Sequence, residues 1–333
     1  MLEDLNLEIV RSAHGRIVSY VLRTPLLRVT TCIKGDERVG ELYLKAENLQ
    51  PVGAFKIRGA FSFMTTLPSD CRGVVTHSSG NHAQAVARAS RVLGIPASIV
   101  MPENAPQMKR DAVELEVERG GVTIVTVGPD SNERRKVAIN IAENDGLVLV
   151  PPYDHLLVAA GQGTAALEMC EDIVGMGEEM DRFYAPISGG GLMAGCATVV
   201  SAMFPDAEIV GVEPVNGADT KKSLEVGRRV AVPPPETIAD GLRVRIPGEK
   251  TFPVLQRYVN RVETVCDEEL LRTMGYALRE LRVVLEPSGA AALAVALREG
   301  VGRCGVILSG GNLDTALLAD VIDMVARKED QHQ

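Results

Sequence analysis

One short segment contains an amine in an unusual setting. The sequence NLQPVGAFKIRGAF, residues 48–61, places Lys56 between Phe55 and Ile57. Burial among apolar side chains disfavours the charged ammonium and lowers the pKa of a lysine. A neutral lysine can form a Schiff base with a carbonyl compound and later act as a base. The simpler interpretation is a surface lysine whose apolar stem is covered while its charge reaches water.

A glycine-rich turn provides a candidate anion site. In SGGGLMAG, residues 188–195, three consecutive glycines separate a predicted strand from a predicted helix. Backbone N–H groups at the positive end of a helix bind phosphate. The alternative is a tight turn that needs glycine for packing alone. Pyridoxal phosphate requires one lysine and one phosphate site, so this turn and Lys56 together predict it as the cofactor.

The same turn also fits a different cofactor. Gly189-x-Gly191-x-x-Ala194 matches a dinucleotide fingerprint, and Glu213 ends the following strand, where a ribose-binding acid is expected. An NAD-binding oxidoreductase is therefore a competing prediction. A single match of this kind is weak, and it leaves Lys56 without a role.

Two further turns carry polar side chains. SSGNHAQ, residues 78–84, offers hydroxyls, an amide and free N–H groups at a helix start, which suit a carboxylate or a ring oxygen. Ser and Asn are also common helix N-caps, which is the simpler interpretation. EPVNGAD places Glu213 and Asp219 in one turn, where their carboxylates could hold Mg²⁺ or Ca²⁺. Before any resemblance is considered, a solvated acidic loop is the preferred interpretation of this last pattern.

The elements that must position these residues alternate between strand and helix. GVVTHSSGN, PASIVMP, VTIVTVG, DRFYAPIS, AEIVGVEP and GVILSGGN read as strands, and amphipathic helical segments separate them. This alternation predicts an α/β fold with parallel sheets and right-handed crossovers. The polar turns fall at carboxyl ends of strands, where open α/β sheets bind ligands. We expect a small mobile domain over residues 50–149 and a large cofactor-binding domain from residues 1–49 plus 150–333.

Composition excludes several classes of protein. The net charge of −9 argues against general binding to nucleic acid or to an anionic membrane. No apolar run approaches the length of about 20 residues that spans a bilayer, and the acidic N-terminus differs from a signal peptide. The six cysteines are scattered without a C-x-x-C pair, which suits a reducing cytoplasm.

Six motifs in order resemble one enzyme family. VGAFKIRGA, SSGNHAQA, AGQGTAALE, SGGGLMAG, PPETIADGL and LSGGN are similar to the motifs of fold-type II pyridoxal-phosphate enzymes, in particular the serine/threonine dehydratase and serine racemase family. The resemblance covers essentially the whole chain, and the ordered set is far more specific than any single motif. It implies the tryptophan synthase β-like fold, with two open, twisted, mainly parallel sheets covered by helices on both faces. It also implies a homodimer.

The resemblance assigns roles to individual residues. Lys56 would bond covalently to the cofactor, Phe55 would flank its ring, and Asn81 would bind its phenolic oxygen. The backbone of Gly189, Gly190, Gly191 and Leu192 would hold the phosphate. Ser309 would face the pyridine nitrogen, and a neutral hydroxyl there suits β-elimination better than transamination. The residues expected around the substrate are Ser78, Ser79, Asn81, His82 and Gln162.

Other matches concern specificity and a metal. Glu213, Gly217 and Asp219 match the family's site for a divalent cation, most simply Mg²⁺, with Ca²⁺ or Mn²⁺ as alternatives. Ser79 would pass a proton to the face opposite Lys56, as a racemase requires. Arg134 matches an arginine near the substrate entrance and could meet a second carboxylate, although a solvated helix face is the simpler interpretation.

The implied reaction is dehydration and deamination of a 3-hydroxy amino acid, which is an ammonia-lyase activity. L-Threonine or L-serine is the default substrate, and serine racemase or 3-hydroxyaspartate dehydratase is the alternative. Tyr153 and Val244 depart from the racemase pattern and favour a dehydratase. A protein that binds the cofactor without catalysis is a third possibility.

Overall fold

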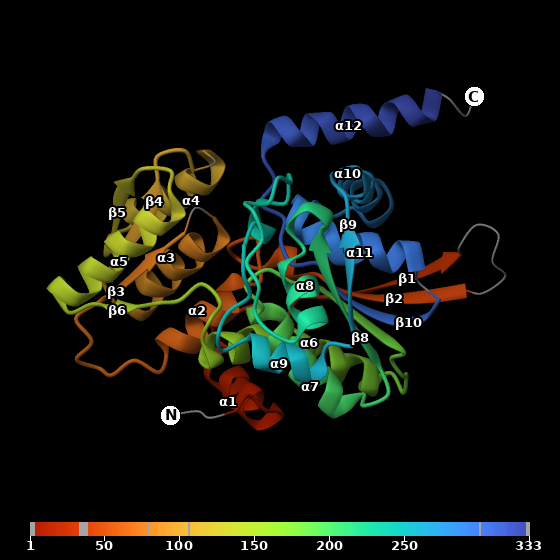
Figure 1. Cartoon of the computed structure of the whole chain (residues 1–333), viewed down its shortest axis with the longest axis horizontal. Helices are drawn as coiled ribbons and strands as arrows, with labels where there is room; N and C mark the ends of the chain where they lie inside the picture. The colour runs from red at the N-terminus through yellow and green to blue at the C-terminus, as the bar shows by residue number, and fades with distance from the viewer. Residues whose placement is uncertain (1–3, 33–38, 79, 106, 300, 331–333) are drawn as a thin grey trace.

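The computed structural model describes residues 4–32, 39–78, 80–105, 107–299 and 301–330. Two sheet-based lobes lie side by side, the smaller in orange and yellow and the larger in red, green and blue (Figure 1). The small lobe has a four-stranded parallel sheet in the order β5-β4-β3-β6. Its strands are β3 (Val74–His77), β4 (Ala97–Pro102), β5 (Val122–Val127) and β6 (Val148–Leu149).

The large lobe has a six-stranded sheet in the order β1-β2-β10-β7-β8-β9. Only the β1–β2 pair is antiparallel among the described pairings of this sheet. The strands are β1 (Leu26–Cys32), β2 (Val39–Lys45), β7 (Arg182–Pro186), β8 (Glu208–Pro214), β9 (Arg261–Val265) and β10 (Gly302–Ile307). The mainly parallel α/β fold that the alternation predicted is thereby confirmed.

Helices cover both faces of the large sheet because its strands are apolar on both sides. Tyr43, Phe183 and Ile209 point to one face, which packs on α1 (Leu7–Ile17), α6 (Leu156–Gly175), α7 (Gly191–Met203) and α9 (Phe252–Tyr258). Their neighbours Leu42, Tyr184 and Val210 point to the other face, which packs on α10 (Asp267–Tyr276), α11 (Pro287–Glu299) and α12 (Thr315–Asp330).

The small lobe is layered in the same way. Val74 and Ile99 face α2 (Lys56–Met64), α3 (Asn81–Leu93) and α4 (Gln107–Glu118), whereas Val75 and Val100 face α5 (Ser131–Asp145). Helix α2 lies between the lobes and carries Lys56 at its first position (Figure 1). The proposed boundaries at residues 50 and 149 stay a prediction.

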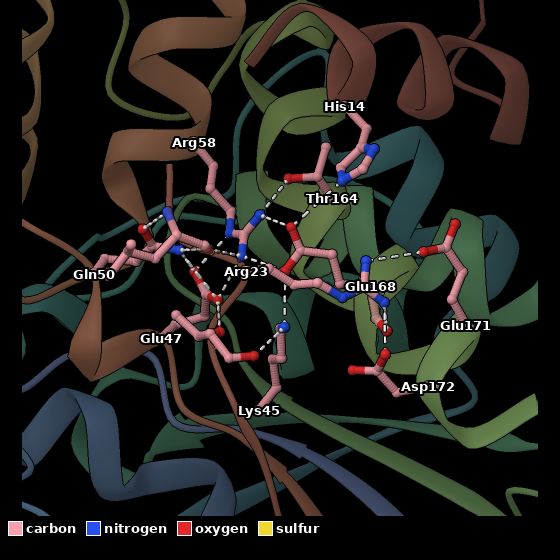
Figure 2. Close-up of polar contacts among 12 residues, drawn as sticks. His14, Arg23, Lys45, Glu47, Gln50, Arg58, Thr164, Glu168, Glu171 and Asp172 are labelled. Carbon is pink, nitrogen blue, oxygen red and sulfur yellow. Dashed lines mark hydrogen bonds and ion pairs between the residues drawn. The ribbon is translucent and has the colours of Figure 1, made fainter. Parts of the chain in front are cut away.

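A buried ion cluster fixes α2 against the large lobe (Figure 2). We call Arg58, Glu47, Glu168 and Lys45 the Arg58 cluster; each side chain is at most 1% exposed. Arg58 donates from Nε to Glu47 Oε2 at 2.7 Å and from Nη1 to Glu168 Oε1 at 2.8 Å. Lys45 Nζ lies 2.7 Å from Glu168 Oε2. Two cations therefore meet two carboxylates, and the buried charges balance.

Burial by itself would raise the pKa of the Glu168 carboxyl, but contacts with His14, Arg58 and Lys45 hold it well below its usual range. Glu168 therefore stays ionised. Among the described residues, no helix combines the length and the apolar character needed to cross a membrane.

Candidate active site

The segment before Lys56 is tied to the end of strand β10. Phe55 N donates to Ser309 O at 3.1 Å, and Gly311 N donates to Gly53 O at 2.8 Å. Gly53 has a φ of +67°, and a Cβ there would lie 2.4 Å from Asn312 Oδ1. The local turn therefore requires glycine and places Lys56 beside the predicted pyridine contact, Ser309.

Few polar contacts compensate the burial of the Lys56 ammonium. Its Nζ donates to Pro152 O at 2.7 Å and lies 5.1 Å from the centroid of the Phe55 ring. No ion pair joins Lys56 to a carboxylate within the described ranges. Burial lowers the pKa of Lys56 to about 8, so the neutral amine is accessible near physiological pH. This is the environment that its apolar neighbours predicted.

The triple-glycine turn precedes α7 as expected. Gly190 has a φ of +93°, and a Cβ at Gly189 would lie 2.1 Å from Tyr153 Cδ2. The backbone amides of residues 189–193 donate to no acceptor within the described part of the chain. Free amides at the start of a helix are suited to an anion.

Residues 152 and 153 bring the lysine and the turn together. Pro152 O accepts the hydrogen bond from Lys56, and the next residue, Tyr153, has its ring against Gly189. Thr251 Oγ1 donates to Gly189 O at 2.6 Å and fixes the turn from the other side. Lys56 and the glycine turn therefore lie at one site, although more than a hundred residues separate them in the sequence.

The SSGNHAQ turn joins the same site through Asn81. Asn81 Nδ2 donates to Glu286 Oε1 at 2.5 Å, and Asn81 Oδ1 accepts from Asn312 Nδ2 at 2.9 Å. Ser78 Oγ accepts from Gly80 N at 3.2 Å. Ser79 lies outside the described residues, so its predicted role stays a prediction.

His82 and Gln162 have structural partners. His82 Nε2 lies 3.2 Å from Val150 O, and burial, with Lys56 nearby, lowers the pKa of His82 to about 3. A neutral ring donates from Nε2 to that carbonyl, which leaves Nδ1 without a partner among the described residues. Gln162 Oε1 accepts from Gly59 N at 3.0 Å, within the first turn of α2. Gln162 thus supports the helix that carries Lys56.

Arg134 approaches the end of strand β3. Burial, followed by the charges of Arg134 and Arg135, lowers the pKa of His77, the residue before Ser78, to about 4. Burial also lowers the pKa of Arg134, and its Nε has no hydrogen-bond partner among the described residues. A solvated helix face is therefore a poor description of this side chain.

Ser309 is buried beside the same turn. Its side chain is 4% exposed, and its Oγ lies 3.4 Å from Ser288 O. This hydroxyl is a neutral hydrogen-bonding group at the position where the resemblance places the pyridine nitrogen.

The predicted metal ligands form a buried acidic pair. Glu213 ends β8 and accepts from Thr220 N at 3.0 Å and Lys221 N at 2.9 Å, while Asp219 begins α8 (Asp219–Val226). Burial raises the pKa of Glu213 to about 7. Burial and the Glu213 charge raise that of Asp219 to about 8. Asp219 Oδ2 is buried with no hydrogen-bond partner in the described chain. A buried pair of carboxylates with this orphaned oxygen fits a divalent cation.

Side chains alone do not complete a metal site. The described residues contain no group of three or more His, Cys, Asp or Glu positioned to hold an ion. The third ligand would therefore be a backbone oxygen, as the resemblance implies for Gly217 in the 3₁₀ turn Val215–Gly217.

Sequence reasoning missed several residues around the site. Lys109, Asp240 and Glu286 form an ion cluster next to Asn81. Asp240 lies in the PPETIADGL motif, to which no individual role was assigned, whereas Lys109 and Glu286 read as parts of ordinary helices. A lysine in the first turn of a helix is a signal for Lys109, because the positive end of a helix disfavours a cation.

Comparisons with known proteins agree with this geometry. The family described as "Pyridoxal-phosphate dependent enzyme" matches residues 17–310. The chain is 39% identical to L-threo-3-hydroxyaspartate ammonia-lyase of Saccharomyces cerevisiae, over 94% of this chain and 95% of that protein.

Two solved structures are similar along nearly their whole length. A threonine deaminase from T.th. has a TM-score of 0.86 and 41% identity, covering 93% of this chain and 99% of its own. Maize serine racemase has a TM-score of 0.87 and 37% identity, covering 99% of both chains. The match favours pyridoxal phosphate over NAD as the cofactor. The chain has a desolvated lysine beside free helix-start amides, and its relatives use the same fold. It therefore belongs to the pyridoxal-phosphate dependent enzyme family.

Proposed function

We propose that this enzyme eliminates water from a 3-hydroxy amino acid, with L-threonine or L-serine as the default substrate. The observation that carries the proposal is the partly neutral Lys56 amine placed beside the free amides of the glycine turn. The similar proteins include an ammonia-lyase, a deaminase and a racemase, all named for amino acids or their reactions.

The residues present fit pyridoxal phosphate. The amides of residues 189–193 would hold its phosphate, and the Cβ-free backbone at Gly189 and Gly191 lets the turn pack on Tyr153. Lys56 would bond to its aldehyde carbon, with Phe55 beside the ring. Asn81 and Ser309 would bond its two polar ring positions. When bound, the cofactor supplies a ring that withdraws electrons from the substrate's Cα.

The chain's own residues would then move protons. The neutral Lys56 amine takes the Cα proton, and the low pKa of this lysine keeps a useful fraction of it in the basic form. The Cβ–O bond then breaks, and the hydroxyl leaves as water with the proton that Lys56 took from Cα. Hydrolysis of the released unsaturated amino acid gives a 2-oxo acid and ammonia. Ser78, Asn81 and His82 would bind the substrate carboxylate, and Ser79 would protonate the opposite face in a racemase side reaction.

A divalent cation, most simply Mg²⁺, is part of the proposal. Glu213 and Asp219 would hold it through carboxylate oxygens and Gly217 through its carbonyl. The charge of the ion would stabilise the ionised form of both acids, whose pKa values are raised in its absence. The bound ion would stabilise the fold between β8 and α8. It has no part in the proton transfers at Lys56.

A second candidate substrate is 3-hydroxyaspartate. The partly buried Arg134 guanidinium near His77, whose Nε has no partner in the described chain, is suited to the extra carboxylate of such a substrate. Replacing Arg134 with Met should lower kcat/KM for 3-hydroxyaspartate more than that for L-serine, measured side by side.

The assembly and location complete the proposal. The small domain, residues 50–149, would move as a mobile lid in a cytoplasmic homodimer. Leu22 and Leu49 are about half exposed, at 51% and 46%, and such exposed apolar side chains are candidates for contact with a second subunit. Light scattering of the purified protein measures the subunit number.

The decisive experiment replaces Lys56 with Ala in protein supplied with pyridoxal phosphate and Mg²⁺. Oxo acid release and the chirality of the remaining substrate are followed with L-Ser, D-Ser, L-Thr and the 3-hydroxyaspartate isomers. We expect the elimination rate to fall about 10³-fold or more, because both the covalent link and the base are lost. Lys136→Ala, at an exposed position on α5, is the matched control and should retain full activity. Near wild-type turnover by Lys56→Ala would reject the proposal.

A further inference from the structure

Lys109 joins the two lobes next to the site. It lies in the first turn of α4 in the small lobe, and its side chain is 5% exposed. Its Nζ lies 2.6 Å from Asp240 Oδ2 and 3.2 Å from Glu286 Oε2, both in the large lobe. The Lys109 stem also lies against Gly80 of the SSGNHAQ turn. A Cβ added at Gly80 would lie 3.4 Å from Lys109 Cδ, which is close contact. One side chain thus contacts both walls of the site.

The position of Lys109 is electrostatically demanding. The start of a helix carries partial positive charge, which opposes a cation there. Burial also opposes the charge, yet Glu286 and Asp240 together raise the pKa of Lys109 above its usual value. The ammonium therefore depends on the large lobe for its stability, and separation of the lobes would take it away from both carboxylates.

One branch of the contacts leads from Lys109 to Asn81. Glu286 Oε1 accepts from Asn81 Nδ2 at 2.5 Å while Glu286 Oε2 faces Lys109. Glu286 N donates to Gly310 O at 3.1 Å, next to Ser309. The carboxylate of Glu286 therefore orients the amide that is expected to bind the cofactor's phenolic oxygen.

The other branch leads from Asp240 to Ser309. The residue after Asp240, Gly241, donates from its N to Ser288 Oγ at 3.0 Å. Ser288 O in turn lies 3.4 Å from Ser309 Oγ. Lys109 thus contacts Glu286, which binds Asn81, and Asp240, whose neighbour Gly241 is linked through Ser288 to Ser309.

We propose that Lys109 is a positioning residue, which holds the small lobe closed on Asp240 and Glu286 and through them orients Asn81 and Ser309 toward the cofactor. The inference rests on the pyridoxal-phosphate site described above. Lys109 itself acts through its partners and takes no part in the bond changes.

The test compares Lys109→Met and Lys109→Arg with Lys136→Met, an exposed lysine of the same lobe. Hydrogen–deuterium exchange of residues 80–93 and 107–118 reports lobe closure, and equilibrium dialysis gives the dissociation constant for pyridoxal phosphate. We expect Lys109→Met to raise exchange in both segments and to weaken cofactor binding about tenfold. Lys109→Arg should keep hydrogen exchange and cofactor affinity close to those of the wild type. Lys136→Met should match the wild type.

A double-mutant cycle keeps the test independent of folding defects. Asp240→Asn removes the charge at nearly constant shape, so its effect should resemble that of Lys109→Met in kind. If the two residues act as a pair, the double variant will be less impaired than the sum of the single effects. Additive effects, or exchange and cofactor binding in Lys109→Met equal to those of Lys136→Met, would overturn the proposal.

The outcome is separable from the proposed reaction. Exchange and cofactor affinity require no substrate, so they decide the role of Lys109 even if no hydroxy amino acid is turned over. Conversely, elimination activity that depends on Lys56 would stand if Lys109→Met behaved like the control.

Discussion

Among the described residues, buried carboxylates are neutralised by cations in the Arg58 cluster but not in the acidic pair of Glu213 and Asp219. In the Arg58 cluster two cations meet two carboxylates, and Glu168 has a pKa well below its usual range. Glu213 and Asp219 form no ion pair with a cation in the described chain, and burial raises the pKa of both. A balanced buried cluster keeps its groups ionised, whereas two buried acids without a counter-ion favour the protonated form.

Lys45 and Lys56 show a similar contrast in how their charges are compensated. Burial lowers the pKa of both, but Lys45 contacts Glu168 Oε2 at 2.7 Å and donates to Thr24 O at 2.7 Å, whereas Lys56 donates to Pro152 O without an ion-pair partner in the described ranges. Lys45 therefore serves the fold, and Lys56 is available for chemistry.

The largest effect on stability is expected from Arg58→Met. It leaves Glu47 and Glu168 with Lys45 as the remaining cation of the cluster, and breaking such a cluster costs about 3–5 kcal/mol. Denaturant unfolding of the apoprotein measures the loss. The matched control is Arg272→Met, since Arg272 pairs with Glu268 at the surface and should contribute about 0.5 kcal/mol or less. Equal losses in the two variants would mean that the balance of buried charge is unimportant.

Metal removal should expose the acidic pair to titration. Without a cation, the folded pKa values of about 7 and 8 lie above the ordinary values of 4.5 and 3.8. The folded state therefore binds more protons, and stability is highest below about pH 4 from these groups and is lost as the pH rises through 7 and 8. Since each pKa unit corresponds to about 1.4 kcal/mol, the loss between pH 5 and pH 8.5 should be several kcal/mol.

The measurement is denaturant unfolding after chelation, at pH 5 and pH 8.5, with and without saturating Mg²⁺. Magnesium should abolish most of the decline. The double variant Glu213→Gln, Asp219→Asn should lack both the decline and the response to Mg²⁺. A chelated wild type that follows the same pH profile as this variant would contradict the interpretation of the pair.

The smallest effect is expected from Lys56→Met. The folded pKa of about 8 lies below the ordinary 10.5, so the ammonium costs stability below pH 8, and the cost disappears as the pH approaches 10.5. Removing the amine should raise the free energy of unfolding of the apoprotein by up to about 3 kcal/mol at pH 7, since each pKa unit corresponds to about 1.4 kcal/mol. Parallel unfolding curves at pH 7 and pH 10 test this, and a lower stability of the variant at pH 7 would assign Lys56 to the structural class of Lys45.

Much of the site was predictable from local patterns. Lys56 next to Phe55, the glycines at 189–191 and the strand–turn–helix order each follow from neighbouring residues, and the structure places them as expected. Strand β6 comprises only Val148–Leu149, and the chain then makes a detour that places Pro152 and Tyr153 between the lysine and the glycine turn. Hydrophobic periodicity carries no information on that detour.

The sequence by itself determined which functional groups are present: an amine in an apolar segment, a glycine-rich turn before a helix and two nearby acids. Only the tertiary structure decided which charges are compensated, because Arg58 and Glu168 are 110 residues apart and Lys109 and Asp240 are 131 residues apart. Burial and counter-ions come from distant segments brought together by packing, so the pKa of a side chain is a property of the fold.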